Sequence, residues 1–397
     1  MRNTVSMPDQ KIILIIPELT MGGAQNSFSR LAMALSDKYE VVTVVFDHGS
    51  PIFYDLPGKL LTLSEKPDKT VFSKLMTFFK RWKKLRSIKK QINPTASISF
   101  LEGADYLNIL SKRHEKVIIS IRGSKWFDPN LRSYLFFLRA KLLMPLLYRR
   151  ADQIACVNNG IAGELANFFS IPAKKLTVIG NYLTLDMFHA DEEMSQLDET
   201  LKSFPYFLYF GRLAPEKGLS DLFRVFSLVK TEKPQLKLLI VGDGPEKENL
   251  VHLAYKLGLT AGDHAQADVW FTGAINRVSP YIRFATASLM NSVSEGFPNS
   301  MIESLFYKTP VISADCPYGP REIFEAGEGR VLNKIYPVKT GGGVLLQNVN
   351  ASSEEMWKNV LLDFVNNGFS IDNKFYERLI LSVSKDHVIE KWQSIIK

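Results

Sequence analysis

Two glutamates, Glu295 and Glu303, flank a turn in the stretch SVSEGFPNSMIES, where an apolar run gives way to a helical pattern. A carboxylate only accepts hydrogen bonds, so it can bind two neighbouring hydroxyl groups of a sugar ring. Ser300 and Glu303 also have the spacing of a capping box, which stabilises a helix start without any ligand. That alternative explains Glu303 and leaves Glu295 unexplained. The pair is therefore a candidate site for a molecule rich in hydroxyl groups.

Two cations, Arg212 and Lys217, lie in GRLAPEKG, between an apolar run and the start of a helical pattern. Cations beside the free N–H groups of a helix start are suited to a diphosphate. The alternative is a solvated loop in which Lys217 pairs with Glu216 or another carboxylate. A second junction of this kind, VGDGP, contains Gly242 and Gly244, which could let a planar base approach or simply allow a tight turn.

A third glycine-rich turn, MGGAQ, follows the first predicted strand and contains Gly22 and Gly23. Their N–H groups could contact a phosphate or a sugar, or the segment could be a plain tight turn. The pattern is not G-x-G-x-x-G, so the fingerprint of a nicotinamide or flavin cofactor is absent. The histidines show no metal-ligand spacing, and no D-x-D occurs. We therefore expect no cofactor and no metal ion.

These segments need a scaffold, and short apolar runs alternate with helical patterns along the chain. The predicted strands cover residues 11–17, 41–46, 97–100, 116–121, 153–157, 176–180, 206–211, 236–242, 269–273, 287–291, 310–314 and 342–346. Such alternation is typical of doubly wound α/β domains, in which helices cover both faces of a parallel sheet.

A polar, acidic stretch at 189–203 interrupts the alternation and is predicted to be an interdomain linker. We expect an N-terminal domain over residues 1–188 and a C-terminal domain over 204–380. The last segment, 381–397, is predicted to be helical and could pack back on the N-terminal domain. The cleft between two such domains is the expected ligand site.

Charge is unevenly distributed between the two halves of the chain. Residues 1–190 contain 27 Lys+Arg and 15 Asp+Glu, a net of +12, and the remainder contains 22 and 26, a net of −4, which together give +8. Within the first half, FSKLMTFFKRWKKLRSIKK (72–90) places Phe72, Leu75, Phe79 and Trp82 at helical spacing among Lys and Arg residues. This pattern is typical of a helix on a membrane surface, and the alternative is an ordinary helix packed on the first domain. No nucleic-acid-binding module accompanies the charge, so we expect no nucleic-acid partner.

The sequence also bears on location. The N-terminus has only the short apolar run KIILIIP, and no stretch approaches 18 apolar residues, so we expect neither a signal peptide nor a spanning helix. The two cysteines, Cys156 and Cys316, provide no disulfide framework, which fits a reducing compartment. We expect a cytoplasmic protein that is peripheral on the inner face of the cytoplasmic membrane.

Four segments together resemble glycosyltransferase family 4 over nearly the whole chain: MGGAQ, GRLAPEKG, VGDGP and SEGFPNSMIESLFYKTPVISADCPYGPREI. The last is the most specific, because it contains the family's E-x7-E signature as Glu295 and Glu303. The resemblance implies the GT-B fold, in which two Rossmann-like doubly wound α/β domains face each other across a cleft. It makes the first domain the acceptor-binding one and the second the nucleotide-sugar-binding one.

The resemblance also implies a role for each site residue. Glu295 would contact the donor sugar and Glu303 the ribose, while Arg212 and Lys217 would bind the donor diphosphate. The backbone of the turn would help to orient sugar and phosphate, at Gly296, Phe297 and Asn299. Gly242 and Gly244 would belong to the same donor site, and the loop of Gly22 and Gly23 would lie near the phosphate and the acceptor.

One position departs from the family pattern. Many members have a His-Asp pair after a mid-domain strand of the first half, whereas this chain reads IISIRGSKW with Arg122 at the histidine position. Some polysaccharide-assembling members look similar in this respect. Arg122 could hold a phosphate or the acceptor, or it could form a salt bridge.

The predicted function is that of a retaining, metal-independent glycosyltransferase. It would transfer a sugar from a nucleoside-diphosphate sugar, UDP-linked, to a lipid-linked or polysaccharide acceptor in bacterial surface glycan assembly. Two alternatives stay open on sequence: a nucleotide-sugar 2-epimerase of the same fold, and a non-catalytic subunit that binds sugar nucleotides.

Overall fold

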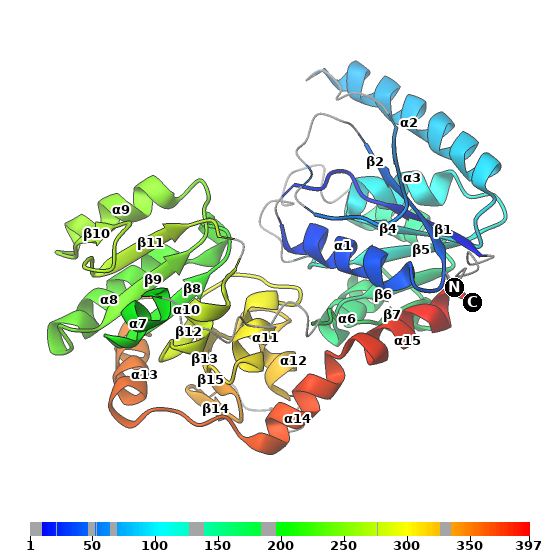
Figure 1. Cartoon of the computed structure of the whole chain (residues 1–397). Helices are drawn as coiled ribbons and strands as arrows, with labels where there is room; N and C mark the ends of the chain where they lie inside the picture. The colour runs from blue at the N-terminus through cyan, green and yellow to red at the C-terminus, as the bar shows by residue number, and fades with distance from the viewer. Residues whose placement is uncertain are drawn as a thin grey trace, which may run out of the picture. The chain divides into compact units, whose positions relative to one another are not determined.

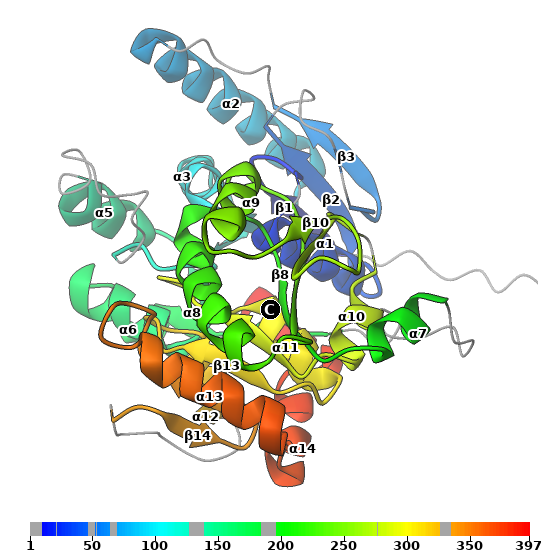
Figure 2. The same cartoon turned by 90° about the vertical axis from the view of Figure 1, so that its left-hand side faces the viewer.

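The computed structural model of the chain describes residues 10–20, 22–46, 52, 54–63, 70–126, 139–183, 196–275, 277–325 and 335–397. The chain forms two compact units, each with its own sheet (Figures 1 and 2). Unit 1 comprises Met1–Asn181 and Lys385–Lys397, and unit 2 comprises Tyr182–Ser384. The last helix of the chain thus belongs to the same unit as the N-terminal half.

Unit 1 contains a seven-stranded sheet in the order β3-β2-β1-β4-β5-β6-β7, and every neighbouring pair is parallel. Its strands are β1 (Lys11–Ile15), β2 (Glu40–Val45), β3 (Lys59–Thr62), β4 (Ala96–Phe100), β5 (Lys116–Ile121), β6 (Gln153–Cys156) and β7 (Leu176–Val178). The five inner strands are mostly apolar and are buried over all or all but the first of their residues, as expected for strands covered on both faces.

Helices cover both faces of this sheet. They are α1 (Gly23–Leu35), α2 (Val71–Ile92), α3 (Glu102–Leu110), the π-helical turn η2 (Arg139–Leu143), α5 (Met144–Tyr148), α6 (Asn159–Phe168), the short turn η3 (Ala173–Lys175) and α15 (Lys385–Ile396). On one face, Leu85 of α2 and Leu107 of α3 pack with residues of β1 and β2. On the other, the Phe100 ring contacts Phe28 of α1 and Trp392 of α15.

Unit 2 contains an eight-stranded sheet in the order β10-β11-β9-β8-β12-β13-β15-β14. Its strands are β8 (Tyr206–Phe210), β9 (Lys237–Val241), β10 (Ala261–Gly262), β11 (Val269–Gly273), β12 (Ala287–Met290), β13 (Val311–Ala314), β14 (Val338–Thr340) and β15 (Gly343–Leu346). All neighbouring pairs are parallel except the edge pair β14–β15, which is antiparallel.

The helices of unit 2 also cover both faces of its sheet, and successive residues of β8 contact helices on opposite faces. They are α7 (Gln196–Lys202), the short turn η5 (Pro215–Lys217), α8 (Leu219–Glu232), α9 (Lys247–Lys256), α10 (Ser279–Arg283), α11 (Asn299–Phe306), α12 (Pro320–Glu325), α13 (Glu354–Asn367) and α14 (Asn373–Ser382). Phe207 packs with Phe223 of α8 and Trp357 of α13, whereas Tyr206 packs with Leu201 of α7 and Tyr281 of α10.

The structure confirms the doubly wound α/β prediction, and each predicted strand has a counterpart. The sequence did not predict three short edge strands, β3, β10 and β14. The second half of the stretch assigned to a linker forms α7, whose Leu201 is fully buried against unit 2. Residues 189–195 of that stretch lie outside the described residues. In the described part of the chain, we find no helix that combines the length and the apolar character needed to cross a bilayer.

Candidate functional site

The predicted donor site lies at the point of unit 2 where the strand order reverses. β8 has β9 on one side and β12 on the other, and β12 is followed by β13 on its far side, so the connections that leave β8 and β12 run in opposite directions. In open parallel sheets, ligands bind outside the carboxyl ends of the two strands at this position. Here those ends lead into residues 211–218 after β8 and residues 291–298 after β12. The cationic loop and the first glutamate therefore meet at the expected edge of the sheet.

Main-chain and amide hydrogen bonds hold the two loops together. The Val293 N–H donates to the carbonyl of Glu216 at 2.9 Å, and the Asn291 side-chain amide donates to the carbonyl of Gly218 at 3.0 Å. Gly218 has φ +61°, and a Cβ there would lie 2.5 Å from the carbonyl oxygen of Asn291. Only glycine fits this position, which is also the start of α8.

Gly242 and Gly244 allow the loop after β9 to lie directly on the loop after β8. Leu213 N–H donates to the carbonyl of Asp243 at 2.9 Å. A Cβ on Gly242 would lie 2.0 Å from the carbonyl oxygen of Gly211, and one on Gly244 would lie 2.2 Å from that of Leu213. In the structure these glycines serve backbone packing between the loops after β8 and β9. Their contact with a nucleotide base stays a prediction.

Lys217 and Glu295 form an ion pair across the two loops. Lys217 Nζ lies 2.6 Å from Glu295 Oε1, and the hydroxyl of Ser292 donates to the same oxygen at 2.7 Å. The two side chains are 23% and 13% exposed. Burial works to lower the pKa of Lys217, but Glu295 beside it outweighs burial and the pKa is raised. Lys217 is therefore a cation at neutral pH, held in place by Glu295, the carboxylate that the sequence also singled out.

Arg212 lies at the start of the same loop and pairs differently. Its guanidinium donates to Glu216 Oε1 at 2.5 Å, and its side chain is 63% exposed. The alternative considered on sequence paired Lys217 with Glu216 or another carboxylate; that carboxylate is Glu295, and Glu216 pairs with Arg212 instead. A pair this exposed contributes little to stability, so the Arg212 side chain is available for another anion.

The helix after the turn begins earlier than the capping-box interpretation requires. α11 starts at Asn299, its N-cap is Pro298, and no side chain caps it, so that interpretation was wrong. Ser300 lies inside the first turn, where its hydroxyl cannot act as the N-cap, because proline already occupies that position. Glu303 is the fifth residue of the helix and is half-buried. Gly296 and Phe297 form the turn before it, and Phe297 packs on the core beneath α11.

Sequence reasoning missed two residues that shape this site. Ser292 binds Glu295, as described above. Gly319, with φ +67°, lies so close that a Cβ there would be 2.9 Å from Pro298 Cδ and 3.3 Å from Glu295 Cβ. Gly319 lies inside a segment that carried the family resemblance and Ser292 lies two residues before it, but nothing in their local spacing indicated contact with Glu295.

The remaining predicted residues belong to unit 1, where Gly22 and Gly23 follow β1. The strand order of this sheet reverses between β1 and β4, so the loop occupies the corresponding position of unit 1. Gly22 is the N-cap of α1, which has no side-chain cap. Its N–H donates to the Tyr54 hydroxyl at 3.0 Å, and that hydroxyl donates to the Gly22 carbonyl at 3.1 Å. The Gly22 N–H is thus already bonded, whereas a Cβ on Gly23 would meet nothing within 4 Å.

Arg122 follows β5 and is bound by neutral groups. Its guanidinium donates to the Ile179 carbonyl at 3.3 Å and to the side-chain oxygen of Asn181, and it lies 5.5 Å from the centre of the Phe100 ring. Burial lowers the pKa of Arg122 to about 9. Over the described ranges no carboxylate pairs with it, so the structure does not support the salt-bridge alternative.

Comparison with known proteins agrees with the fold and the motifs. The sequence profile described as "Glycosyltransferase Family 4" matches residues 21–187, and the one described as "Glycosyl transferases group 1" matches residues 191–338. Together they cover most of both units. The chain belongs to glycosyltransferase family 4.

The family's relatives match along most of the chain. It is 26% identical over 334 residues to the N-acetylgalactosamine-N,N'-diacetylbacillosaminyl-diphospho-undecaprenol 4-alpha-N-acetylgalactosaminyltransferase of Campylobacter jejuni, which covers 82% of this chain and 86% of the relative. It is 28% identical over 292 residues to an uncharacterized glycosyltransferase of Methanocaldococcus jannaschii, at 71% and 70% coverage.

Solved structures of low identity share the GT-B fold. The lipopolysaccharide outer core galactosyltransferase WaaB in its apo form matches with a TM-score of 0.67 and 20% identity, over 98% of this chain and 99% of that one. Anabaena HepE in complex with UDP and glucose matches with a TM-score of 0.73 and 15% identity, over 97% and 98%. Among the described residues, no group of three or more His, Cys, Asp or Glu side chains is placed to hold a metal ion.

Proposed function

We propose that this glycosyltransferase is a retaining, metal-independent enzyme that uses a UDP-linked sugar and a lipid-linked or polysaccharide acceptor of bacterial surface glycan assembly. The observation that carries the proposal is the Lys217–Glu295 pair at the edge of β8 and β12. It puts a cation for a diphosphate and a carboxylate for sugar hydroxyls 2.6 Å apart. The C. jejuni relative acts, by its name, on an undecaprenol diphosphate-linked glycan, and HepE binds UDP and glucose.

In the proposed reaction the donor's diphosphate is held by Lys217 and Arg212, the ribose by Glu303, and the sugar hydroxyls by Glu295. The bond between the anomeric carbon and the diphosphate oxygen breaks, and the electron pair leaves with the nucleoside diphosphate. The acceptor hydroxyl forms the new bond on the same face of the sugar, and its proton moves to the departing diphosphate. The cations take the place of a divalent metal, since they stabilise the charge that develops on the leaving group.

A lipid-linked acceptor requires the enzyme to work at a membrane. We infer a peripheral protein on the inner face of the cytoplasmic membrane. Support comes from the net charge of +12 over residues 1–190 and from α2, which has eight Lys and Arg residues and no acidic residue. Anionic lipid headgroups attract such a surface.

Donor binding tests the site. We expect Lys217→Ala and Glu303→Ala each to weaken UDP-sugar binding at least tenfold in calorimetry. Unchanged affinity in both variants would mean that the donor binds elsewhere. A thermal-shift panel of nucleotide sugars would identify the cognate donor, because a ligand stabilises the state that it binds.

Product analysis tests the chemistry. Transfer in the presence of a metal chelator should continue undiminished, and the anomeric configuration of the product, read by NMR, should match that of the donor. Conversion of the UDP-sugar without any acceptor would instead indicate a nucleotide-sugar 2-epimerase. Tight UDP-sugar binding with no turnover by any acceptor would indicate a non-catalytic subunit.

A further inference from the structure

Glu102 occupies in unit 1 the place in the sheet topology that Glu295 has in unit 2. The strand order of unit 1 reverses between β1 and β4, as that of unit 2 reverses between β8 and β12. β4 ends at Phe100, and Glu102 is the first residue of α3. The side chain therefore belongs to the carboxyl edge of the sheet, at the position where open parallel sheets bind ligands.

One oxygen of the Glu102 carboxylate is held by a hydroxyl group and a cation. The Tyr106 hydroxyl donates to Glu102 Oε1 at 2.6 Å, and Arg139 Nε of η2 lies 3.1 Å from the same oxygen. Glu295 Oε1 is likewise held by one hydroxyl group and one ammonium group, as described above. The two glutamate side chains are also similarly exposed, 15% for Glu102 and 13% for Glu295. Each carboxylate is thus fixed in orientation by its own unit.

The other oxygen of each carboxylate accepts no hydrogen bond from the residues that the structure describes. Beside Glu102 Oε2 lies Lys125 Nζ, at 3.9 Å, which is an ion pair but too long for a hydrogen bond. A hydroxyl group can donate to a carboxylate and accept from an ammonium group at the same time. Glu102 Oε2 and Lys125 therefore offer complementary partners for a hydroxyl group.

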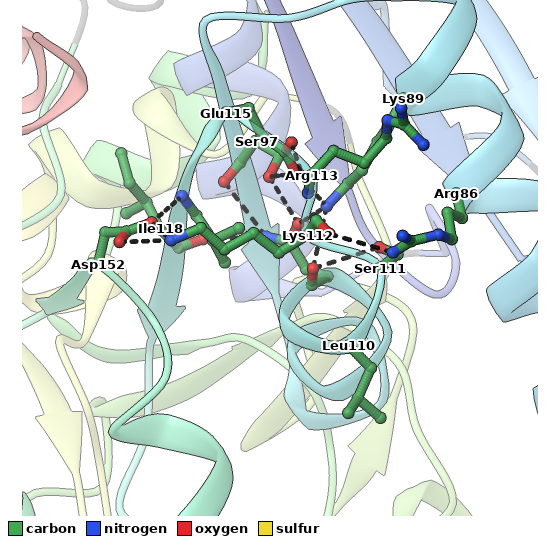
Figure 3. A network of polar contacts seen from close by, with 12 residues as sticks. Arg86, Lys89, Ser97, Leu110, Ser111, Lys112, Arg113, Glu115, Ile118 and Asp152 are labelled. Carbon is green, nitrogen blue, oxygen red and sulfur yellow. Dashed lines mark hydrogen bonds and ion pairs between the residues drawn. The ribbon is translucent and has the colours of Figure 1, made fainter.

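Carboxylates that hold the elements of unit 1 together use both oxygens. Glu115 binds a lysine through Oε1 at 2.8 Å and a main-chain N–H through Oε2 at 3.1 Å (Figure 3). Asp152 binds Lys112 through Oδ1 at 2.6 Å and a main-chain N–H through Oδ2 at 2.7 Å. Glu164 binds two main-chain N–H groups through Oε1 and the Ser124 hydroxyl through Oε2. Glu102 departs from this pattern, so holding α3 in place accounts for only half of its carboxylate.

A second carboxyl group of α3, that of Asp105, is unsuited to a ligand. Asp105 is fully buried, and its Oδ1 accepts from the Ser99 hydroxyl at 2.7 Å. Burial raises the pKa of Asp105 to about 8, so this group is neutral at pH 7. Glu102 is ion-paired and partly exposed, and it is therefore the carboxylate of α3 that a ligand can contact.

We propose that Glu102 binds a hydroxyl group of the acceptor saccharide, with Lys125 donating to that hydroxyl group. The inference rests on the proposed transfer of a sugar to a glycan acceptor. It gives each unit one carboxylate for sugar hydroxyls, Glu295 for the donor and Glu102 for the acceptor. The donor sugar is the other source of such hydroxyls, and Glu295 already binds them in the proposed reaction.

Transfer kinetics of the full chain test the assignment. The donor is the nucleotide sugar that stabilises the protein most. The acceptors are glucose, galactose, N-acetylglucosamine and N-acetylgalactosamine, each as an octyl glycoside and as a farnesyl diphosphate conjugate. Glu102→Ala should lower kcat/KM for the acceptor about 10- to 150-fold, because a hydrogen bond to a charged group is lost. Glu102→Gln keeps a neutral acceptor and should lower it about fivefold, while the affinity for UDP stays unchanged in both variants.

Two further variants separate binding from structure. Arg139→Gln breaks the same ion pair but leaves the Glu102 carboxylate, so it should lower kcat/KM for the acceptor less than about twofold. Asp152→Asn breaks the pair with Lys112 just before β6, at the opposite edge of the sheet, and should leave kcat/KM unchanged. If Arg139→Gln lowers kcat/KM as much as Glu102→Gln does, or if neither Glu102 variant lowers it, Glu102 only links α3 to η2 and the proposal is overturned.

The remaining outcomes distinguish the donor from the acceptor and this inference from the proposed function. Weaker binding of the nucleotide sugar by Glu102→Gln, with UDP affinity unchanged, would assign Glu102 to the donor sugar and overturn the proposal. Failure of the unchanged protein to transfer to any of these acceptors would contradict the proposed function. Saturation-transfer NMR of the octyl glycosides with UDP-saturated protein then still tests Glu102, since glycoside binding that survives Glu102→Ala would contradict the assignment.

Discussion

Lys217 and Glu295 should affect nucleotide binding in opposite directions, although they form one ion pair. With Lys217 Nζ 2.6 Å from Glu295 Oε1, the carboxylate neutralises part of the charge that the diphosphate would use. Lys217→Met removes the cation. Glu295→Gln keeps the shape of the side chain and an oxygen for the Ser292 hydroxyl, and it removes the competing negative charge.

The two effects can be estimated from the geometry. A charge-assisted hydrogen bond to a phosphate is worth about 1.5 to 3 kcal/mol, so Lys217→Met should weaken UDP binding about 10- to 150-fold. Two like charges about 6 Å apart repel by about 2.8 kcal/mol at an effective dielectric of 20. Partial exposure of Glu295 reduces this to about 1 kcal/mol, so Glu295→Gln should tighten UDP binding about fivefold.

The assay is titration calorimetry with UDP alone, because the sugar of a full donor would add its own contacts with Glu295. Lys256→Met, at an exposed lysine near the end of α9, is the control for loss of a positive charge from unit 2. Transfer should fall in both site variants. If Glu295→Gln weakens UDP binding as much as Lys217→Met does, the pair is only a structural link between two loops, and the reasoning fails.

Three further predictions concern stability. Burial raises the pKa of Asp105 to about 8, so the folded protein keeps a proton on this carboxyl group that the unfolded chain releases above about pH 4. The free energy of unfolding should therefore fall by about 1.4 kcal/mol per pH unit between pH 5 and 7. Asp105→Asn should abolish this slope in urea titrations. Lys89→Met should cost about 3 to 5 kcal/mol because Glu115 stays buried without a cation, and adding Glu115→Gln should restore most of it, as urea unfolding would show. Gly218→Ala should cost more than about 1 kcal/mol by the same measurement, since φ is +61° and a Cβ would clash with a carbonyl; no loss would mean that the loop relaxes.

The sequence predicted most of the fold because its strands are short, apolar and regularly spaced. A run such as KVIISI is buried on both faces, and its residues match β5 residue for residue. The edge strand β3 was missed because it is partly exposed. Lys59 and Leu60 are exposed, so the burial pattern of β3 differs from that of the inner strands. Edge positions lack the burial that makes a strand recognisable from composition.

The candidate site was predictable to the extent that it depends on residues close in sequence. Arg212 and Lys217 follow one strand and Glu295 another, and the parallel order of the sheet brings those strand ends together. Contacts made by packing were not predictable, since Gly319 reaches Glu295 only through the folding of the loop after β13. The same limit applies to α2, where helical spacing grouped Trp82 with Phe79 and only the packing on α3 separates them.

Lys217 is paired with a carboxylate and Arg122 is bound by neutral groups, and this difference bears on the role of Arg122. Glu295 neutralises Lys217, whereas the partners found for Arg122 in the described parts of unit 1 are a carbonyl, an amide oxygen and a ring. Keeping a partly buried cation without a carboxylate costs folding free energy, as its lowered pKa reflects. That cost is offset when an anion binds beside the guanidinium. Of the two roles that the sequence left open, the charge balance therefore favours contact with a phosphate or an acidic acceptor over a structural salt bridge.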